Sequence, residues 1–315
     1  MVVLRDLPST STGPSVREMI IGSEGRLGIV TEVTIQVHRL PERREVIAYM
    51  FPNWDKALLA MHAVVRSEAH PVFTRISDAA ETAFSLSTQK APASTLKKVK
   101  AFGTDRLWDV LRLRGWDTDA MCISYVCYEG SKAHNEREQK TVKDIVAAHG
   151  GIVLGSGPGA LYDQKKFDTP YIRDFLLDRR TVGDVSETAV PWAKLAEVHR
   201  AGREAVQRAF AEIGRRGFVM CHLSHSYHSG ACLYFTFAFV LDDAGDDLEQ
   251  YDTVKRAIQQ SFMDSGATLS HHHGVGTEHR PWMTQDLSSE GVALLAGLFA
   301  SADPSRQLNP GKVLE

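Results

Sequence analysis

The stretch 232–241 constrains the fold of this chain more than any other, because large apolar side chains there alternate strictly with small or polar ones. The apolar side of the alternation consists of Leu233, Phe235, Phe237, Phe239 and Leu241. The other side consists of Tyr234, Thr236 and Ala238. A period of two residues is that of a β-strand, whose successive side chains point to opposite faces of the sheet. The stretch therefore predicts a strand in an antiparallel sheet that helices cover on one side.

The rest of the chain mixes strand and helix patterns. Runs rich in β-branched and aromatic residues predict further strands at 46–51, 72–76, 121–127, 152–154 and 218–224. Apolar residues at helical spacing predict helices at about 53–69, 133–149, 192–213, 249–266 and 288–301. Because helices are mixed with hairpin-connected strands, we expect an α+β fold rather than a doubly wound parallel sheet.

Composition limits the function only broadly. The chain has 315 residues, 43% hydrophobic and 24% charged, with a net charge of −3, as is typical of a soluble globular protein. No basic run with interleaved aromatic residues occurs, so we expect no nucleic-acid partner. The four cysteines form no C-x-x-C pair and no disulfide framework. No apolar run reaches the length of a membrane span.

The first 44 residues have a character of their own. Three glycines lie within the seven residues from Gly22 to Gly28, and they let the backbone turn sharply or approach another group closely. The next run, from Ile29 to Val37, is rich in β-branched residues and predicts a strand. Residues 40–43 have the composition of a linker, so we expect a domain boundary there.

A second glycine-rich string, at 155–159, does not have the features of a phosphate-binding loop. It lacks the lysine of a Walker loop and the spacing of a dinucleotide-binding fingerprint. Pro158 also removes one amide donor. The string therefore predicts a turn, and its distance from the substrate is left open.

The most unusual string is His271-His272-His273, followed by Gly-Val-Gly. Adjacent histidines in an extended segment point to alternate sides, so the three rings are not expected to converge on one metal ion. No H-E-x-x-H pattern or cysteine partner supports a metal site. A polar surface loop is one interpretation, but acid–base chemistry near neutral pH suits imidazole better than metal binding does.

Three other residues are candidates for binding or catalysis, and each has a structural alternative. Arg75, in an apolar strand, either pairs with a carboxylate or clamps a phosphate or carboxylate of the substrate. Arg173 either pairs with Asp168 or Asp174 or binds an anion in the same way. Tyr227 lies at a predicted hairpin turn, where packing is the commonest role. None of the three establishes a function by itself.

Taken together, these strings resemble a known family. The segments STSTGP at 9–14 and IGSEGRLGIVTE at 21–32 resemble the end of the FAD-binding domain of the vanillyl-alcohol oxidase superfamily. The strings LSHHHGVG at 269–276 and SYHSGACLYF at 226–235 are similar to those of the alkyl-dihydroxyacetonephosphate synthases, also called alkylglycerone-phosphate synthases. The segments TPYIRD at 169–174 and LNPGK at 308–312 agree, so the resemblance covers nearly the whole chain.

The resemblance implies an FAD-dependent reaction. These synthases replace the acyl group of acyl-dihydroxyacetonephosphate with a fatty alcohol in ether-lipid synthesis, and the flavin N5 forms an adduct with the substrate instead of acting as a net oxidant. Tyr227 maps onto the proton-transferring tyrosine, and Arg75 and Arg173 map onto two anion-binding arginines. The histidines that accept a proton from the alcohol map onto His271, His272 and His273. The backbone that contacts the flavin maps onto Glu24, Gly25, Arg26, Leu27, Gly28, Ile29 and Val30.

The resemblance also implies a domain order. Residues 1–44 correspond to the end of a PCMH-type FAD-binding domain, and residues 45–300 correspond to the substrate or cap domain, of the FAD-linked oxidase C-terminal type. Residues 301–315 correspond to a tail that returns toward the FAD domain. We therefore expect an α+β protein in which a remnant of the FAD-binding domain precedes an antiparallel sheet covered by helices.

Two other functions remain open. The chain could be an FAD-dependent oxidase or dehydrogenase of a hydroxy acid, or an inactive truncated fragment. Net electron flow through the flavin distinguishes the first alternative from a synthase, and flavin absorbance of the purified chain tests the second. We expect a cytoplasmic protein, with membrane association left open, that acts on a small-molecule lipid. Peripheral membrane contact and a homodimer are further expectations.

Overall fold

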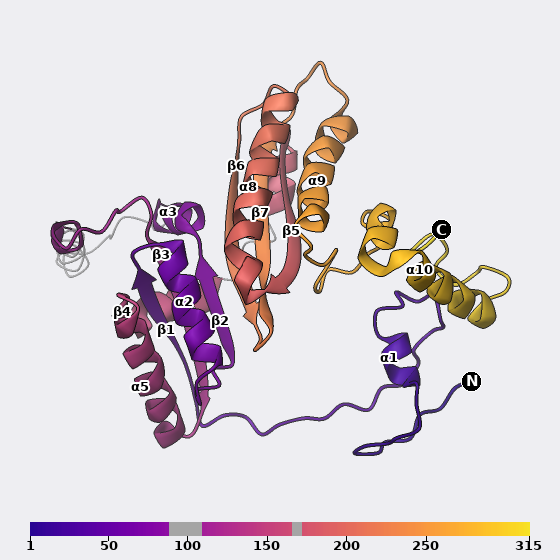
Figure 1. Cartoon of the computed structure of the whole chain (residues 1–315), viewed down its shortest axis with the longest axis horizontal. Helices are drawn as coiled ribbons and strands as arrows, with labels where there is room; N and C mark the ends of the chain where they lie inside the picture. The colour runs from indigo at the N-terminus through magenta and orange to yellow at the C-terminus, as the bar shows by residue number, and fades with distance from the viewer. Residues whose placement is uncertain (88–108, 166–171) are drawn as a thin grey trace. The chain divides into compact units, whose positions relative to one another are not determined.

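The structure is a computed structural model that describes residues 1–87, 109–165 and 172–315 (Figure 1). These residues form two compact units, a small one of Met1–Leu40 with Phe262–Glu315 and a large one of Pro41–Ser261. Residues 262–300, which the sequence analysis placed with the substrate domain, therefore group with the first forty residues. The side chain of Glu24 bonds to the backbone of Val275 and Gly276, and that of Arg26 to the backbone of Lys312 and Leu314. The assignment of FAD-binding and substrate domains stays a prediction.

The large unit is built on a seven-stranded sheet with the order β4-β1-β3-β2-β6-β7-β5. Its strands are β1 (Arg43–Phe51), β2 (Phe73–Ser77), β3 (Cys122–Gly130), β4 (Ile152–Gly155), β5 (Thr181–Pro191), β6 (Gly217–Ser226) and β7 (Gly230–Val240). Every neighbouring pair is antiparallel. The predicted hairpin joins β6 to β7 and β7 is the predicted aromatic strand, so the sequence gives the correct sheet type.

Helices of the large unit pack against this sheet. They are α2 (Trp54–Val65), α3 (Ala79–Ser87), α5 (Lys132–Ala148), α6 (Ser156–Lys165), α7 (Ile172–Leu177), α8 (Leu195–Glu212) and α9 (Asp247–Asp264), with a short 3-10 helix, η2 (Trp192–Lys194). Figure 1 shows α2 beside α5 over one part of the sheet, and α8 over β6 and β7. Side-chain oxygens cap the N-termini of helices in this unit, with Asn53 at α2 and Ser131 at α5.

The aromatic face of β7 is fully covered. Phe235, Phe237 and Phe239 are each at most 2% exposed. Helix α8 lies over them, since the ring of Phe210 is 5.5 Å from that of Phe239 and the ring of His199 is 6.4 Å from that of Phe235. The alternation in the sequence thus predicts correctly which side of the strand is buried.

The opposite face of the sheet differs along its width. Over β1 and β3 it is also apolar, and a second core cluster includes Met50, Ile123 and Tyr125, with Tyr162 of α6 packed against it. At β1 and β3, helices therefore cover more than one face of the sheet. From β2 to β7 the same face carries Arg75, His222 and Tyr234, because each strand pairing places these residues on one side of the sheet. We call this the polar face.

The small unit is held by a core around its longest helix. Its helices are α1 (Val16–Ile20), η3 (Arg280–Trp282) and α10 (Met283–Ala302), and Ser288 with φ 69° and ψ 165° kinks α10. The buried core consists of Leu269, Trp282, Met283, Phe299, Val313 and Leu314. The final residues of the chain therefore belong to the core of this unit.

Two local predictions are wrong. Ile29–Val37 is extended but forms no strand, and the side chains of Ile29, Val30, Val33, Ile35 and Val37 are 61–81% exposed. A strand requires a hydrogen-bonded neighbour, and no strand of the small unit's described residues pairs with this segment. The string 155–159 is not a simple turn, since Gly155 ends β4 with a φ of 95° and Ser156 begins α6.

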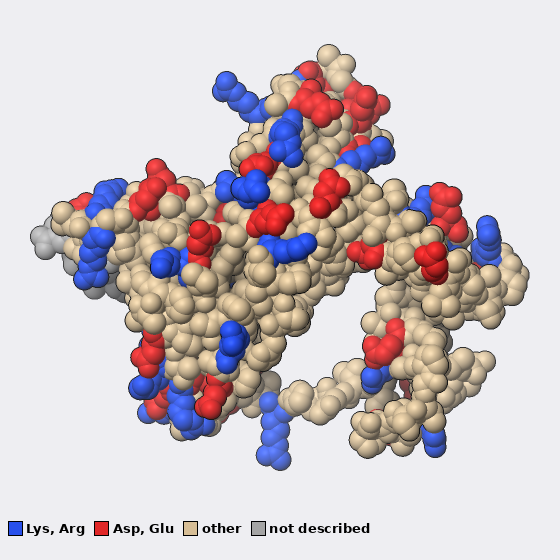
Figure 2. Space-filling model, in the orientation of Figure 1, with Lys and Arg blue, Asp and Glu red and all other residues tan. Residues whose placement is uncertain are grey.

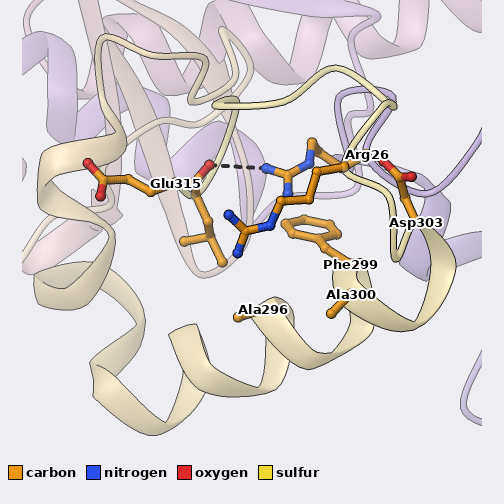
Figure 3. A pocket seen from close by; sticks show the side chains of 8 residues that line it. Arg26, Ala296, Phe299, Ala300, Asp303 and Glu315 are labelled. Carbon is orange, nitrogen blue, oxygen red and sulfur yellow. Dashed lines mark hydrogen bonds between the residues drawn. The ribbon is translucent and has the colours of Figure 1, made fainter.

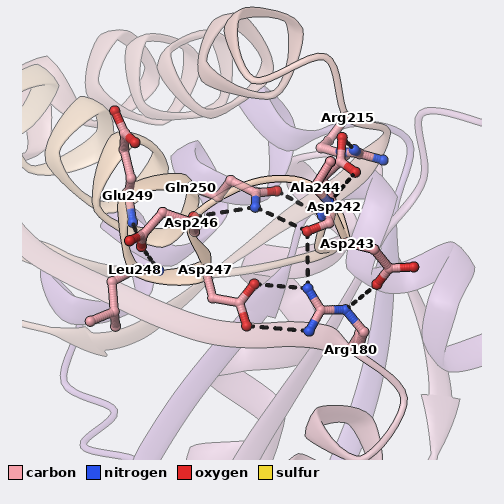
Figure 4. Close-up of polar contacts among 10 residues, drawn as sticks. All are labelled: Arg180, Arg215, Asp242, Asp243, Ala244, Asp246, Asp247, Leu248, Glu249 and Gln250. Carbon is pink, nitrogen blue, oxygen red and sulfur yellow. Dashed lines mark hydrogen bonds and ion pairs between the residues drawn. The ribbon is translucent and has the colours of Figure 1, made fainter.

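Charged residues at the β7–α9 connection have structural partners (Figure 4). Arg180 donates to both carboxylate oxygens of Asp247 and to the backbone oxygen of Asp242, while Arg215 pairs with the Asp242 carboxylate. Asp246 accepts from the N–H groups of Leu248 and Glu249 at the start of α9. The acidic run at 242–249 therefore has a structural role in the connection between β7 and α9.

Charges elsewhere on the surface are mixed in sign. On the face of the large unit visible in Figure 2, the Lys and Arg side chains are interspersed with Asp and Glu. Among the described residues, no helix combines the length and the apolar character needed to span a membrane.

Candidate functional site

The carboxylate of Glu24 holds the loop that follows the histidine run. It accepts hydrogen bonds from the backbone N–H of Val275 at 2.5 Å and of Gly276 at 2.9 and 3.2 Å. Gly274 has a φ of 81°, and a Cβ there would lie 2.8 Å from Oε1 of Glu24, so this position requires glycine. Two motifs about 250 residues apart in the sequence thus form one structural element.

The C-terminal tail closes the same element. The side-chain amide of Asn309 donates to the backbone oxygen of Glu24 at 2.6 Å. Nη1 of Arg26 donates to the backbone oxygens of Lys312, at 2.7 Å, and Leu314, at 3.0 Å. Figure 3 shows the Arg26 guanidinium beside the ring of Phe299, 4.6 Å from its centroid, in the wall of a cavity of about 60 Å³. The side chain of Arg26 is therefore engaged in the structure of the small unit.

The three histidines contact one another in sequence order. The rings of His271 and His272 are 5.1 Å apart at an interplanar angle of 79°, and those of His272 and His273 are 4.5 Å apart at 65°. Nδ1 of His271 is 2.9 Å from Nδ1 of His272. The segment is bent and not extended, so the expectation that neighbouring rings point to opposite sides is wrong.

A fourth histidine, His279, lies beside this loop and was not among the residues singled out from the sequence. His279 is 6% exposed, and its Nδ1–H donates to the backbone oxygen of Gly274 at 3.0 Å. Its backbone N–H donates to the oxygen of Val275. His279 therefore holds the Gly-Val-Gly loop through two hydrogen bonds, one from its side chain and one from its backbone. The sequence signal that could have pointed to His279 is its position three residues after Gly276.

On the polar face, Arg75 belongs to a cluster of ionisable residues. Nη2 of Arg75 bonds to Oε1 of Glu81 and lies 3.0 Å from Nδ1 of His222. Oε2 of Glu81 is 3.0 Å from the same nitrogen. Nε of Arg75 is buried and has no hydrogen-bond partner among the described residues. The structural alternative for Arg75, a carboxylate partner, is thus present, and anion binding by its remaining donors stays a prediction.

Aromatic rings surround this cluster. The guanidinium carbon of Arg75 lies 5.5 Å from the ring centroid of Tyr162, which itself stacks on Tyr125 at 4.3 Å. The ring of His222 stacks on Tyr234 at 4.8 Å. These flat partners restrict the orientation of both the guanidinium and the imidazole.

Burial and charge act in opposite directions on the pKa of Glu81. Burial favours the neutral acid, but Arg75 and His222 outweigh it and lower the pKa of Glu81 to about 2. For His222, burial lowers the pKa below its ordinary value, with Glu81 opposing the effect and Arg75 adding to it. At neutral pH the cluster therefore holds a charged Arg75, a charged Glu81 and a neutral His222. Because an ionised carboxylate only accepts, Nδ1–H of His222 donates to Glu81.

Tyr227 and Arg173 lie outside this cluster. Tyr227 is 48% exposed at the β6–β7 hairpin, where its backbone N–H donates to the oxygen of Gly230 and its backbone oxygen accepts from Nε1 of Trp192. Arg173 is exposed on α7 and pairs with Asp174 at 3.3 Å. The alternative partner Asp168 lies outside the described residues. Catalysis by Tyr227 and anion binding by Arg173 stay predictions.

Comparison with known proteins identifies the family. Residues 40–313 match the family described as FAD linked oxidases, C-terminal domain. The chain belongs to this family. The family and the chain's relatives indicate FAD as the cofactor, as the resemblance implied.

Within this family, the chain is similar to several alkyldihydroxyacetonephosphate synthases. It is 33% identical to the enzyme of Dictyostelium discoideum over 99% of this chain and 50% of that protein, and 32% identical to that of Trypanosoma brucei brucei over the same shares. A solved structure of an alkyldihydroxyacetonephosphate synthase matches with a TM-score of 0.74 and 30% identity over 95% of this chain and 50% of that one. The chain spans about half the length of the curated relatives it matches.

Proposed function

We propose that this chain forms part of an enzyme that exchanges the acyl group of acyl-dihydroxyacetonephosphate for a fatty alcohol. The observation that carries the proposal is the similarity to curated synthases of that name at 28–33% identity over 95–99% of the chain. The matched span, 99% of the chain, includes the positions of both the histidine string and the Gly22–Gly28 segment, which the structure joins through Glu24.

The Gly22–Gly28 segment fits a role next to FAD. Gly22, Gly25 and Gly28 have φ values of 84°, 80° and 154°, which side chains rarely allow. A Cβ on Gly22 or Gly28 would meet no atom within 4 Å, so the backbone there is open to a flat ligand. FAD, when bound, would supply the reactive ring, and the protein would contribute backbone contacts from 24–30.

The remaining residues receive roles in this proposal. Arg75 offers donors to the substrate phosphate. Since Glu81 already offsets its charge, that contact rests on the hydrogen-bonding geometry of the guanidinium more than on net charge. One of His271, His272 and His273 takes the proton of the incoming alcohol, and Tyr227 transfers a proton at the reacting carbon. Arg173 supplies a second anion contact.

The location and partners of the protein are part of the same proposal. We propose that the protein is cytoplasmic and that its lipid substrate brings it into peripheral contact with a membrane. We also propose that it forms a homodimer.

An exchange assay tests the proposed function. The native protein is incubated without oxygen with acyl-dihydroxyacetonephosphate and an isotope-labelled fatty alcohol, while flavin absorbance is recorded. Labelled alkyl product with an oxidised flavin spectrum is the expected result. Bleaching of the flavin by a hydroxy acid, with no alkyl product, would instead support the dehydrogenase, and an absence of both product and flavin would support the inactive fragment.

A further inference from the structure

The loop Gly274–Gly276 is held from three directions. Glu24 accepts from the N–H groups of Val275 and Gly276, and His279 donates to the oxygen of Gly274. The N–H of Val313 donates to the oxygen of Gly276 at 3.1 Å. Such a loop has little freedom, because its backbone donors and acceptors are engaged by groups from distant parts of the small unit.

Glu24 is the charged member of this arrangement. Its carboxylate has two N–H donors, and hydrogen bonds to an ionised group are about twice as strong as neutral ones. The backbone of Glu24 is fixed too, with a φ of 50° and its oxygen bonded to Asn309. Because both the main chain and the side chain of Glu24 are held, the N–H groups of Val275 and Gly276 that bond to it are restricted in position as well.

The histidine run directly precedes this loop. His273 is joined to Gly274 by one peptide bond, and the rings of the run pack on one another in sequence. Motion of the loop would therefore also move the imidazole rings of His271–His273. Catalytic groups lose much of their effect when their position varies by about 1 Å.

We propose that Glu24 is a positioning residue, which fixes the loop that carries His271–His273 and links it to the segment that contacts the flavin. This extends the resemblance, which gave Glu24 only a backbone role near the cofactor. The inference rests on the proposed function for the roles of the histidines and of the flavin segment. Glu24 itself transfers no proton and acts through the loop.

Amide hydrogen exchange in the full chain tests the position of the loop directly. Glu24→Ala should speed exchange at Val275 and Gly276 at least tenfold, and Glu24→Gln, which keeps one acceptor oxygen, should have a smaller effect. Glu18→Ala is the matched control, since Glu18 is an exposed glutamate on neighbouring α1 whose partners are Arg17 and Ser15. Unchanged exchange at Val275 and Gly276 in Glu24→Ala would overturn the proposal.

NMR of the imidazole rings separates positioning from mere stability. Glu24→Ala and Gly274→Ala should both shift the ring resonances of His271–His273, and Glu24→Gln should restore them in part. Ring resonances identical to those of the wild-type chain in both alanine variants would contradict positioning, even if the variants were less stable. Unaltered exchange around Phe299, in the buried core of the small unit, identifies variants whose small unit remains folded. Glu24→Gln is the variant that bears on the proposal if Glu24→Ala does not fold.

Activity then distinguishes this inference from the proposed function. In the native enzyme, Glu24→Gln should lower kcat with little change in KM, as single replacements of the histidines should. If the histidine replacements leave turnover unchanged, the proposed function fails while the exchange result for the loop still stands. If they abolish turnover but Glu24→Gln changes neither turnover nor exchange, positioning by Glu24 fails alone.

Discussion

Replacing Glu81 by Gln should destabilise the large unit in a pH-dependent way. The pKa of the Glu81 carboxyl is about 2 in the folded state against 4.5 ordinarily, a difference of 2.5 units. At 1.36 kcal/mol per unit, this corresponds to about 3 kcal/mol of stability. A folded pKa below the unfolded one means that the contribution is fully present above about pH 4.5 and is lost as the pH falls toward 2. We therefore expect Glu81→Gln to cost about 3 kcal/mol at pH 7 and almost nothing near pH 2.

Urea unfolding at several pH values, followed by tryptophan fluorescence, measures this difference. Asp184→Asn is a suitable control, because Asp184 pairs with the buried Lys255 at 2.9 Å on another part of the sheet. This replacement shows how much of the cost of Glu81→Gln comes from the loss of any ion pair in the sheet. A cost of Glu81→Gln that stays constant from pH 7 to pH 3 would refute the reasoning, since it would show that packing and not charge is lost.

Three further predictions concern single residues. Phe237→Ala should cost about 3–5 kcal/mol in the free energy of unfolding, because the ring is fully buried under helices, and denaturant titration measures it. Tyr227→Phe should abolish turnover of the native enzyme while changing stability by less than about 0.5 kcal/mol, since the side chain is half exposed and only a hydroxyl is removed. Arg75→Lys should weaken binding of dihydroxyacetone phosphate, measured by calorimetry, about as much as Arg75→Ala does, because an ammonium group cannot replace a guanidinium held between Glu81 and Tyr162.

The sheet could be predicted from the sequence because its signals are local. The period of two in β7 indicates both the strand and its buried face, and Phe235, Phe237 and Phe239 are where that period places them. The same reasoning failed at Ile29–Val37, which has an equally strong β-branched pattern. A pattern describes what a segment prefers, whereas a strand also needs a partner for its backbone, and the pattern does not supply one.

The ionisable cluster could be predicted only in part. Arg75 in an apolar strand implied some partner, but its partners Glu81 and His222 are 6 and 147 residues away. The spacing of Asp78 and Glu81 is that of a capping box, in which the glutamate side chain would turn back to the N-cap backbone. Here Asp78 accepts from the N–H of Glu81, but the Glu81 side chain is directed to Arg75 instead. The pairing of β2 with β6 brings the cluster together. This pairing could not be predicted from the sequence pattern.

The two groups of candidate residues are held by different means, and this determines which substitutions they should tolerate. In the small unit, the loop after the histidines is fixed through backbone N–H groups and a left-handed glycine, so Gly274 and Glu24 are constrained while the side chain of Val275 contributes mainly packing. On the polar face, Arg75 is fixed by side chains whose placement depends on strand register, so a change of register would move Arg75 to the other face. We therefore expect Val275→Ile to be nearly neutral in loop exchange and Gly274→Ala to be costly, although each substitution adds only carbon atoms. Equal exchange rates in the two variants would show that the loop is held by its side chains and not by its backbone.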